Sequence, residues 1–145
     1  GTKVVTSGII CDNPKLLSIF EENNIAIAAD DVAHETRSFR VDAPEDELDP
    51  VRALAKQFAN IDYEVLLYDP ESDKNRRGEF VANMVKESGA QGLVLFMQQF
   101  CDPEEMEYPY LKKALKRCRR SAHQTGYRPA DERLRSGKHC YSGIR

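Results

Sequence analysis

Short apolar runs alternate with longer amphipathic stretches over the first 116 residues of the chain. Runs of β-branched and apolar residues bounded by turn signals are typical of strands buried in a parallel sheet. Four stretches fit this description, at residues 3–10, 25–29, 64–68 and 93–97. Because helical stretches separate them, the pattern predicts an α/β fold, a Rossmann- or flavodoxin-like sandwich with a mostly parallel sheet.

Helices between these strands are predicted from apolar side chains at helical spacing. Asp12-Asn13-Pro14 opens the first helix and Asn23-Asn24 ends it, Pro50 opens the second, and Gly89 ends the third. Residues 73–77 are predicted as a solvated turn before the third helix. The stripes predicted to face the core are Leu16, Leu17, Ile19 and Phe20, then Val51, Leu54 and Phe58, then Phe80, Val81, Met84 and Val85.

Polar residues follow the second strand. Asp30 and Asp31 end it, where open α/β sheets bind their ligands, and the alternative is that they cap the next segment. Residues 32–49 then form a stretch with Pro44 and an acidic cluster. At this length and without periodicity, such a loop is usually functional or mobile.

Cys101 lies where the fourth apolar run ends and another helix begins. The sequence Asp102-Pro103-Glu104-Glu105 follows, and Asp at an N-cap, Pro at the first helical position and acids in the first turn are helix-start signals. Cys101 is thus predicted at the carboxyl end of a strand and beside a helix N-terminus, which favours a thiolate. Spacing alone makes it a candidate ligand or nucleophile. Asp102 and Glu104 are predicted first as helix-capping groups, and a role beside a site is the alternative.

The charge and composition narrow the class of protein. The 21 basic and 24 acidic residues give a net charge of −3, which favours neither nucleic acid nor an anionic membrane as a partner. No apolar stretch approaches the roughly 20 residues of a membrane span. No secretory signal opens the chain, and Gly1 stands just before a strand already under way, so we expect a piece of a longer protein.

The four cysteines are Cys11, Cys101, Cys118 and Cys140. None forms a C-x-x-C pair, and their spacing fits neither a zinc site nor a secreted disulfide framework. We therefore expect a reducing, cytoplasmic setting. For any one of them taken alone, a free buried cysteine is the simplest interpretation.

Residues 117–145 break the pattern. They hold seven Arg, one Lys and two acidic residues, and their only large aliphatic residues are Leu134 and Ile144. Such a tail cannot supply the strand and helix that the alternation requires next. We therefore predict an α/β domain at residues 1–116, incomplete at its C-terminus, followed by a basic tail at 117–145.

Three segments of residues 2–116 resemble a known family. They are VVTSGIICDNPKLLSIFEE (4–22), IAIAADDVAHETRSFR (25–40) and FCDPEEMEYP (100–109). They resemble the C-terminal part of the beta subunit of 2-hydroxyacyl-CoA dehydratases, in the wider family that includes benzoyl-CoA reductase. The resemblance implies an α/β domain of one subunit of a cytoplasmic heterodimer.

The resemblance also implies a 4Fe–4S cluster held by three cysteines in each subunit, with no flavin or NAD. Cys101 matches one of these ligands, and the other two are expected outside this chain. Cys11, Cys118 and Cys140 match no ligand of the family. The family commonly has Lys just before the Phe-Cys pair, where this chain has Gln99.

The activity implied by the resemblance is dehydration of an (R)-2-hydroxyacyl-CoA to the enoyl-CoA through a ketyl radical. The implied partners are the alpha subunit, an ATP-dependent activator protein that donates the electron, and the acyl-CoA substrate. One alternative is a benzoyl-CoA-reductase-like subunit, in which the electron stays in the product. Another is a flavodoxin-like signalling or binding module with Asp30 and Asp31 as an acidic metal pocket.

Two arginines in the polar stretch are further candidates. Arg37 and Arg40 could bind a CoA phosphate or an acyl carboxylate bidentately. They could equally pair with Asp30, Glu35 or Asp42 at a surface.

The tail has a specific explanation in the light of the resemblance. In the family, this helix is usually followed by a segment like AGVPHIKLGIDQQ. Codons for residues 117–145 can be chosen whose reading one nucleotide out of register gives DAGVPHIKLGIDQQTNDFGQASTAIQAF. The tail is therefore predicted to be a frameshifted translation, and a basic arm that binds nucleic acid is the alternative.

Overall fold

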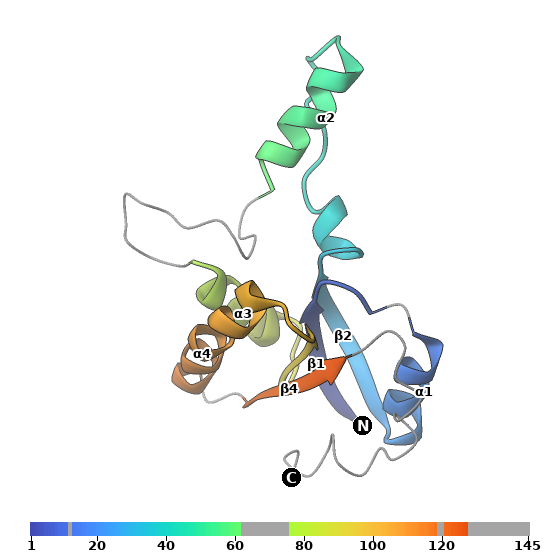
Figure 1. Cartoon of the computed structure of the whole chain (residues 1–145), viewed down its shortest axis with the longest axis vertical. Helices are drawn as coiled ribbons and strands as arrows, with labels where there is room; N and C mark the ends of the chain where they lie inside the picture. Colours follow the sequence, from blue (N-terminus) through green and yellow to red (C-terminus); the bar gives the residue numbers. More distant parts are fainter. Residues whose placement is uncertain (12, 62–75, 119–120, 128–145) are drawn as a thin grey trace.

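Four parallel strands form one sheet in the computed structural model, which describes residues 1–11, 13–61, 76–118 and 121–127 (Figure 1). The spatial order is β2-β1-β3-β4. The strands are β1 (Thr2–Gly8), β2 (Ile25–Val32), β3 (Gly92–Gln98) and β4 (Ser121–Tyr127). The predicted α/β fold with a parallel sheet is confirmed.

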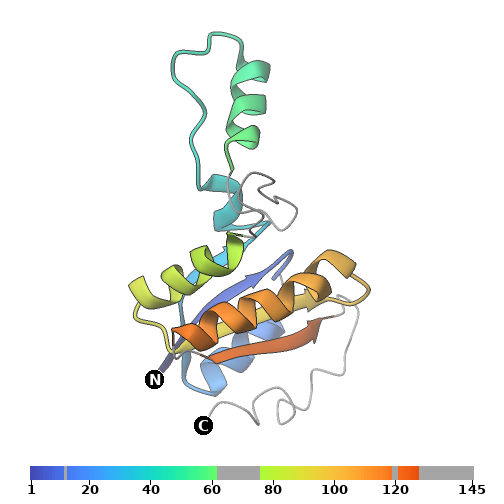
Figure 2. The same cartoon turned by 90° about the vertical axis from the view of Figure 1, so that its left-hand side faces the viewer.

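Helices cover both faces of this sheet. The helix α1 lies on one face, and α3 and α4 lie side by side on the other (Figures 1 and 2). The helical elements are α1 (Pro14–Glu22), the short 3-10 helix η1 (Thr36–Phe39), α2 (Pro50–Ala59), α3 (Arg77–Glu87) and α4 (Asp102–Arg117). Among the described residues, no helix combines the length and the apolar character that crossing a membrane requires.

The strands divide the core between the two faces because successive side chains of a strand point in opposite directions. Val5 faces α3 and α4, where it joins Val81, Leu93 and Leu111. Its neighbour Val4 faces α1 in a second cluster, which also holds Leu16, Phe20, Val94 and Phe96. The apolar runs that predicted β1 and β3 are thus buried on both faces, as a central parallel strand requires.

The order in which the chain adds strands to the sheet reverses at β1, which makes β1 a topological switch point. The chain passes from β1 through α1 to β2, and later returns through α3 to β3 on the other side of β1. Such a switch point opens a crevice at the carboxyl ends of the two central strands. Gly8 ends β1 there with φ 148°, and a Cβ on it would lie 2.5 Å from the Phe96 carbonyl oxygen. A glycine is therefore needed where β1 meets β3.

Several predicted helix ends are confirmed. Asn13 caps α1 by accepting a hydrogen bond from the Lys15 N–H at 3.0 Å. Asn24 and Gly89 follow α1 and α3 with φ values of 55° and 68°, the left-handed conformation that commonly ends helices. Leu17, predicted to face the core, is 44% exposed, whereas the other members of its stripe are buried.

The prediction that α2 faces the core is wrong. Val51, Leu54 and Phe58 are 75%, 61% and 79% exposed, and α2 has no buried residue. Periodicity identified the helix and its apolar side correctly, but it cannot identify what covers that side.

Two further predictions differ from the structure. The solvated turn predicted to include Arg77 is wrong at that residue, because Arg77 begins α3 and is 1% exposed. The tail was predicted to supply no strand, yet β4 pairs with β3 from Gly92 with Ser121 to Gln98 with Tyr127. The strand predicted at 64–68 lies outside the described residues.

Candidate functional site

Cys101 occupies the turn between β3 and α4. Phe100 precedes it with φ 69° and is 83% exposed, and the Cys101 N–H donates to the Gln98 carbonyl at 3.2 Å. Cys101 itself takes the N-cap position of α4, one residue earlier than the predicted Asp102 cap. Its side chain makes no capping hydrogen bond, and the half-buried sulfur lies beside the helix N-terminus, where the thiol interacts with the Glu104 carboxyl.

Glu104 fastens this turn from within α4. It is 3% exposed, and its Oε2 accepts a hydrogen bond from the Gln98 N–H at 2.9 Å. Its position is that of the glutamate in a capping box, but it reaches back to the end of β3 instead of to the N-cap residue. Burial raises the pKa of Glu104, while its hydrogen bond from the Gln98 N–H and the charges of Arg37 and Arg77 oppose that rise, with a smaller effect of the Cys101 thiol. Asp102 is exposed in the first turn, where its charge complements the helix dipole.

A buried ion cluster lies at the carboxyl ends of β1 and β2. Asp31 is fully buried, and three arginines contact its carboxylate. Arg77 Nη2 lies 2.7 Å from Asp31 Oδ2, Arg37 Nη2 lies 3.1 Å from the same oxygen, and Arg40 Nη2 bonds Oδ1. Ser7 at the end of β1 donates its hydroxyl to Oδ2 at 3.1 Å.

Arg77 joins this cluster to α4. Its Nε donates to Glu107 Oε2 at 2.7 Å, and its Nη2 donates to Ser7 Oγ at 2.9 Å. Burial alone would lower the pKa of Arg77, but Asp31 and Glu107 outweigh it and raise that pKa. A single guanidinium thus connects β1, β2 and α4, three of the elements around the Cys101 turn.

The charges of the cluster determine the state of Asp31. Burial would raise the pKa of this carboxyl, but Arg77, Arg37 and Arg40 together lower it below its ordinary value. Asp31 is therefore an anion engaged by several cations. An acidic metal pocket at Asp30 and Asp31 is disfavoured by this arrangement.

Asp30 and the two predicted arginines have local roles in the structure. The Asp30 carboxylate accepts hydrogen bonds from the Thr36 hydroxyl at 2.7 Å and from the Val32 N–H at 3.3 Å, which caps the turn into η1. Arg37 and Arg40 both pair with Asp31, and the Arg40 guanidinium also lies 4.4 Å from the centre of the Phe80 ring. Arg37 is 1% exposed, so it has little surface for a ligand.

Sequence reasoning missed Ser7, Arg77 and Glu107. A signal existed for Ser7, because a hydroxyl at the end of an apolar central strand lies at the ligand edge of the sheet. Glu107 stands three residues after Glu104, hence on the same side of α4. Arg77 had no signal, since it stands in a strongly polar stretch whose charges all look solvated.

A metal group would find one ligand in this part of the protein. Among the described residues, no three His, Cys, Asp or Glu side chains gather as metal ligands. Cys11 packs against the α1 cluster, Cys118 lies exposed at the far end of α4, and Cys140 is outside the described residues. Cys101 could thus supply one cysteine ligand to a metal group, and a complete site would need ligands from beyond the described residues.

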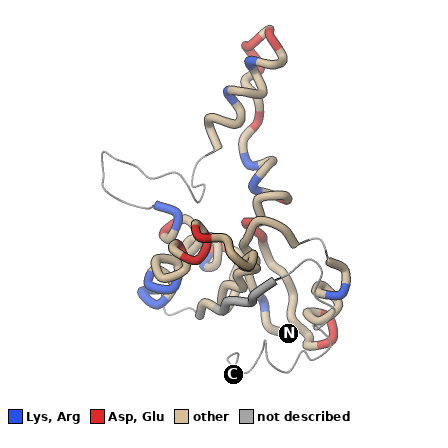
Figure 3. Tube along the Cα trace, viewed as in Figure 1, with Lys and Arg blue, Asp and Glu red and all other residues tan. Residues whose placement is uncertain are grey.

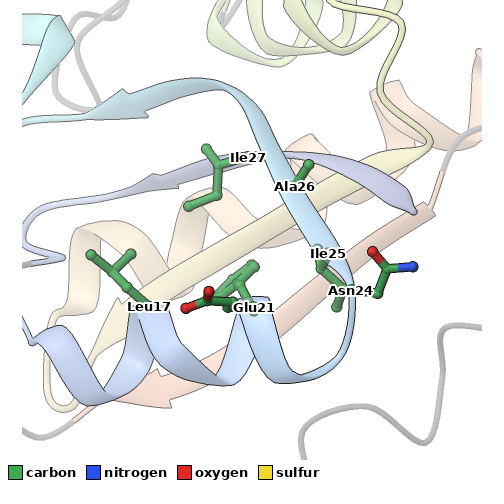
Figure 4. A pocket seen from close by; sticks show the side chains of 7 residues that line it. Leu17, Glu21, Asn24, Ile25, Ala26 and Ile27 are labelled. Atoms are coloured by element: carbon green, nitrogen blue, oxygen red, sulfur yellow. The ribbon is translucent and has the colours of Figure 1, made fainter.

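A shallow pocket lies away from this edge, between α1 and β2 (Figure 4). It has a volume of ≈ 370 Å³, and its walls include Leu17, Phe20, Ile25 and Ile27. Glu21 is its only ionisable lining residue, so it offers no catalytic group near the Cys101 turn.

Comparisons with known proteins match the part of the chain that contains this site. The family model described as 2-hydroxyglutaryl-CoA dehydratase, D-component, matches residues 1–119. The chain is 63% identical over 115 residues to (R)-2-hydroxyglutaryl-CoA dehydratase, subunit beta, of Acidaminococcus fermentans, a match that covers 79% of this chain and 30% of that protein.

Two further relatives are similar over nearly the same length. The (R)-phenyllactyl-CoA dehydratase beta subunit of Clostridium sporogenes is 50% identical over 113 residues, covering 78% of this chain and 29% of the relative. Lactoyl-CoA dehydratase subunit beta of Anaerotignum propionicum is 40% identical over 111 residues, covering 77% and 29%. The chain thus spans under a third of the length of these relatives.

Proposed function

The chain belongs to the 2-hydroxyglutaryl-CoA dehydratase D-component family, and from this membership we propose that residues 1–116 are the C-terminal α/β domain of a dehydratase beta subunit. The complete subunit acts in the cytoplasm with an alpha subunit and an ATP-dependent activator protein. The reaction is dehydration of an (R)-2-hydroxyacyl-CoA to a 2-enoyl-CoA. The names of the three relatives support dehydration over the benzoyl-CoA-reductase alternative.

The observation that carries this proposal is the placement of Cys101. It lies at the switch-point edge of the sheet, at the N-terminus of α4, with a sulfur not committed to capping. We propose that it is one of three cysteine ligands of a 4Fe–4S cluster. When bound, the cluster would supply an electron to the thioester carbonyl, because removal of a non-acidic β-proton is the difficult step.

The residues around Cys101 support its role in positioning and electrostatics. The N-terminus of α4, where Cys101 lies, is the end of a helix dipole that suits an anionic ligand group. Glu104 holds the turn to the end of β3, and Arg77 with Glu107 holds α4 to the strands β1 and β2. These contacts would keep the sulfur in place while the substrate binds and leaves.

Cluster formation tests this proposal in a full-length protein. Residues 1–119 of this chain replace the matched segment of the Acidaminococcus fermentans subunit, giving what we call the joined subunit. Anaerobic reconstitution with iron and sulfide should give a brown chromophore with bound iron. Cys101→Ala should remove it, whereas the matched control Cys118→Ala, an exposed cysteine at the other end of α4, should retain it. A chromophore that survives Cys101→Ala unchanged would rule out this ligand.

We also propose that residues 117–145 are a frameshifted translation. The family match ends at residue 119, which supports a loss of the native sequence near that point. The shifted reading places PHIKLGI over residues 121–127, the segment that forms β4. Apolar residues at that position suit a strand next to β3 far better than SAHQTGY does. Resequencing the gene should reveal a single-nucleotide slip near codon 116, and an intact reading frame there would reject the proposal.

A further inference from the structure

The apolar stripe of α2 faces away from the rest of the described chain. Val51, Leu54 and Phe58 share one face of the helix because they are three and four residues apart. All three are more than 60% exposed. A neighbouring side of the helix contacts the described chain, since Gln57 Nε2 donates to the Val41 carbonyl at 2.6 Å and Ala53 is partly buried. The stripe itself is not the side that packs on the described chain.

This helix stands on a projecting arm. Residues 40–60, here called the arm, extend from the α/β body beyond the end of β2, with α2 at the far part (Figure 2). Leu48 in the arm and Phe39 just before it are two further large apolar residues that are exposed, at 95% and 75%. Single exposed apolar residues are ordinary, but several large ones along one element mark an interaction surface.

The charged residues of the arm indicate which kind of surface would bind it. The arm holds five acidic residues and three basic ones, and the acids gather before α2 at its outer end (Figure 3). Lys56 of α2 is already paired with Glu47. An amphipathic helix of this kind fits an apolar groove, and the acidic end calls for lysine or arginine at that end of the groove.

We propose that the arm docks into such a groove in the part of the full-length subunit that lies outside residues 1–119. The match covers 30% of the Acidaminococcus fermentans subunit. Most of that subunit therefore lies outside the matched segment and could provide the groove for the arm. The inference rests on the proposed function in one respect. The remaining cluster ligands must approach Cys101 at the carboxyl edge of the sheet, and the arm leaves the body at that same edge.

Hydrogen exchange of α2 tests the docking. In the isolated 145-residue chain, the amides of residues 50–59 should exchange as those of a solvent-exposed helix. In the joined subunit we expect their exchange to be at least about tenfold slower, because docking removes local opening. Equal rates in the two proteins would overturn the proposal. So would protection that appears only when the partner subunit is added, or protection of the isolated chain that rises with its concentration.

Variants identify the contact surface. Leu54→Glu with Phe58→Glu should abolish the protection in the joined subunit. The matched control Arg52→Glu adds negative charge to an exposed position outside the stripe and should leave the protection intact. If the double glutamate variant fails to fold, Leu54→Ala with Phe58→Ala serves the same purpose. Equal loss of protection with Arg52→Glu would overturn the assignment of the stripe.

The outcome is distinguishable from that of the cluster experiment. Iron content and the chromophore report on Cys101, whereas exchange of residues 50–59 reports on the arm. Protection of α2 without bound iron would reject the cluster and leave the docking in place. Bound iron that requires Cys101, together with an unprotected α2, would reject the docking and leave the cluster in place.

Discussion

Asp31 illustrates how much one buried carboxylate can organise. It is fully buried, and its two oxygens receive Arg37, Arg40, Arg77 and the Ser7 hydroxyl. A buried charge is costly unless it is paired, so removing one member leaves the others uncompensated. Asp31 is the carboxylate that all three arginines share, and Arg77 also pairs with Glu107.

Asp31→Asn should therefore be strongly destabilising. We expect a loss of about 3–5 kcal/mol in the free energy of unfolding, measured with urea, because buried guanidinium groups lose their counter-charge. Asp42→Asn, at an exposed position, should change the same quantity by less than about 0.5 kcal/mol. A small effect of Asp31→Asn would mean that water reaches the cluster.

The same cluster predicts a pH dependence. The arginines lower the pKa of Asp31 in the folded state below its ordinary value of 3.8. Its stabilising contribution is complete above the ordinary value and declines as the pH falls toward the lower pKa of the folded state. The difference in unfolding free energy between the wild type and Asp31→Asn should therefore narrow below pH 3.8. A difference that widens there would contradict the assigned direction.

At this scale the sequence was informative where a residue follows a strand. The apolar run before Cys101 and the helix signal after it placed the thiol correctly at the edge of the sheet. Arg77 could not be placed in the same way. Its burial depends on Asp31 and Glu107, which lie far from it in the sequence and come together only in the folded chain.

At the scale of the elements, the contact between α3 and α4 depends on a glycine. A Cβ on Gly78 would lie 3.2 Å from the Ala114 Cβ, closer than ordinary van der Waals contact. This close approach brings α3 against α4 and so helps to place Arg77 beside Glu107.

Gly78→Ala should reveal this contact in a double-mutant cycle. Alone, it gains helix propensity, about 0.5–1 kcal/mol, but crowds Ala114. In an Ala114→Gly background the crowding is absent, so Gly78→Ala should be stabilising there. We expect a coupling energy of at least about 0.5 kcal/mol from urea unfolding of the four proteins. Additive effects would show that the helices separate without cost.

Elements were predictable where local chemistry determines them. Asn13, Asn24 and Gly89 mark helix ends through capping and left-handed backbone, and both are local properties. The orientation of α2 was not predictable, because periodicity identifies an apolar side without identifying the surface that covers it. The strand β4 was missed because its pairing with β3 overrides a weakly apolar sequence.

At the scale of the whole molecule, the described residues form an α/β body and an arm that contributes no residue to the two core clusters. The body holds two apolar clusters, one on each face of the sheet. None of the buried residues in these clusters comes from α2. The stability of the body should therefore be independent of the arm.

Leu54→Glu and Phe58→Glu in the isolated chain test that independence. Each should change the free energy of unfolding by less than about 0.5 kcal/mol, as surface substitutions do. The comparison is Leu111→Ala in the core between α4 and the sheet, which should cost about 2–5 kcal/mol. If Leu54→Glu or Phe58→Glu lowered the free energy of unfolding as much as Leu111→Ala does, the arm would have to fold back onto the body.

The sequence separation of the contacts in the Asp31 cluster bears on the order in which they form during folding. The β1–α1–β2 unit is local in sequence, whereas Arg77 and Ser7 are 70 residues apart. Contacts that close long loops form late, after their entropic cost has been met. Interactions formed after the transition state mainly slow unfolding and leave the folding rate nearly unchanged. Of the three arginines, Arg37 and Arg40 are 6 and 9 residues from Asp31, so only the contacts of Arg77 close a long loop. We therefore expect Arg77 to act mainly on the unfolding rate, and so on the lifetime of the folded α/β body.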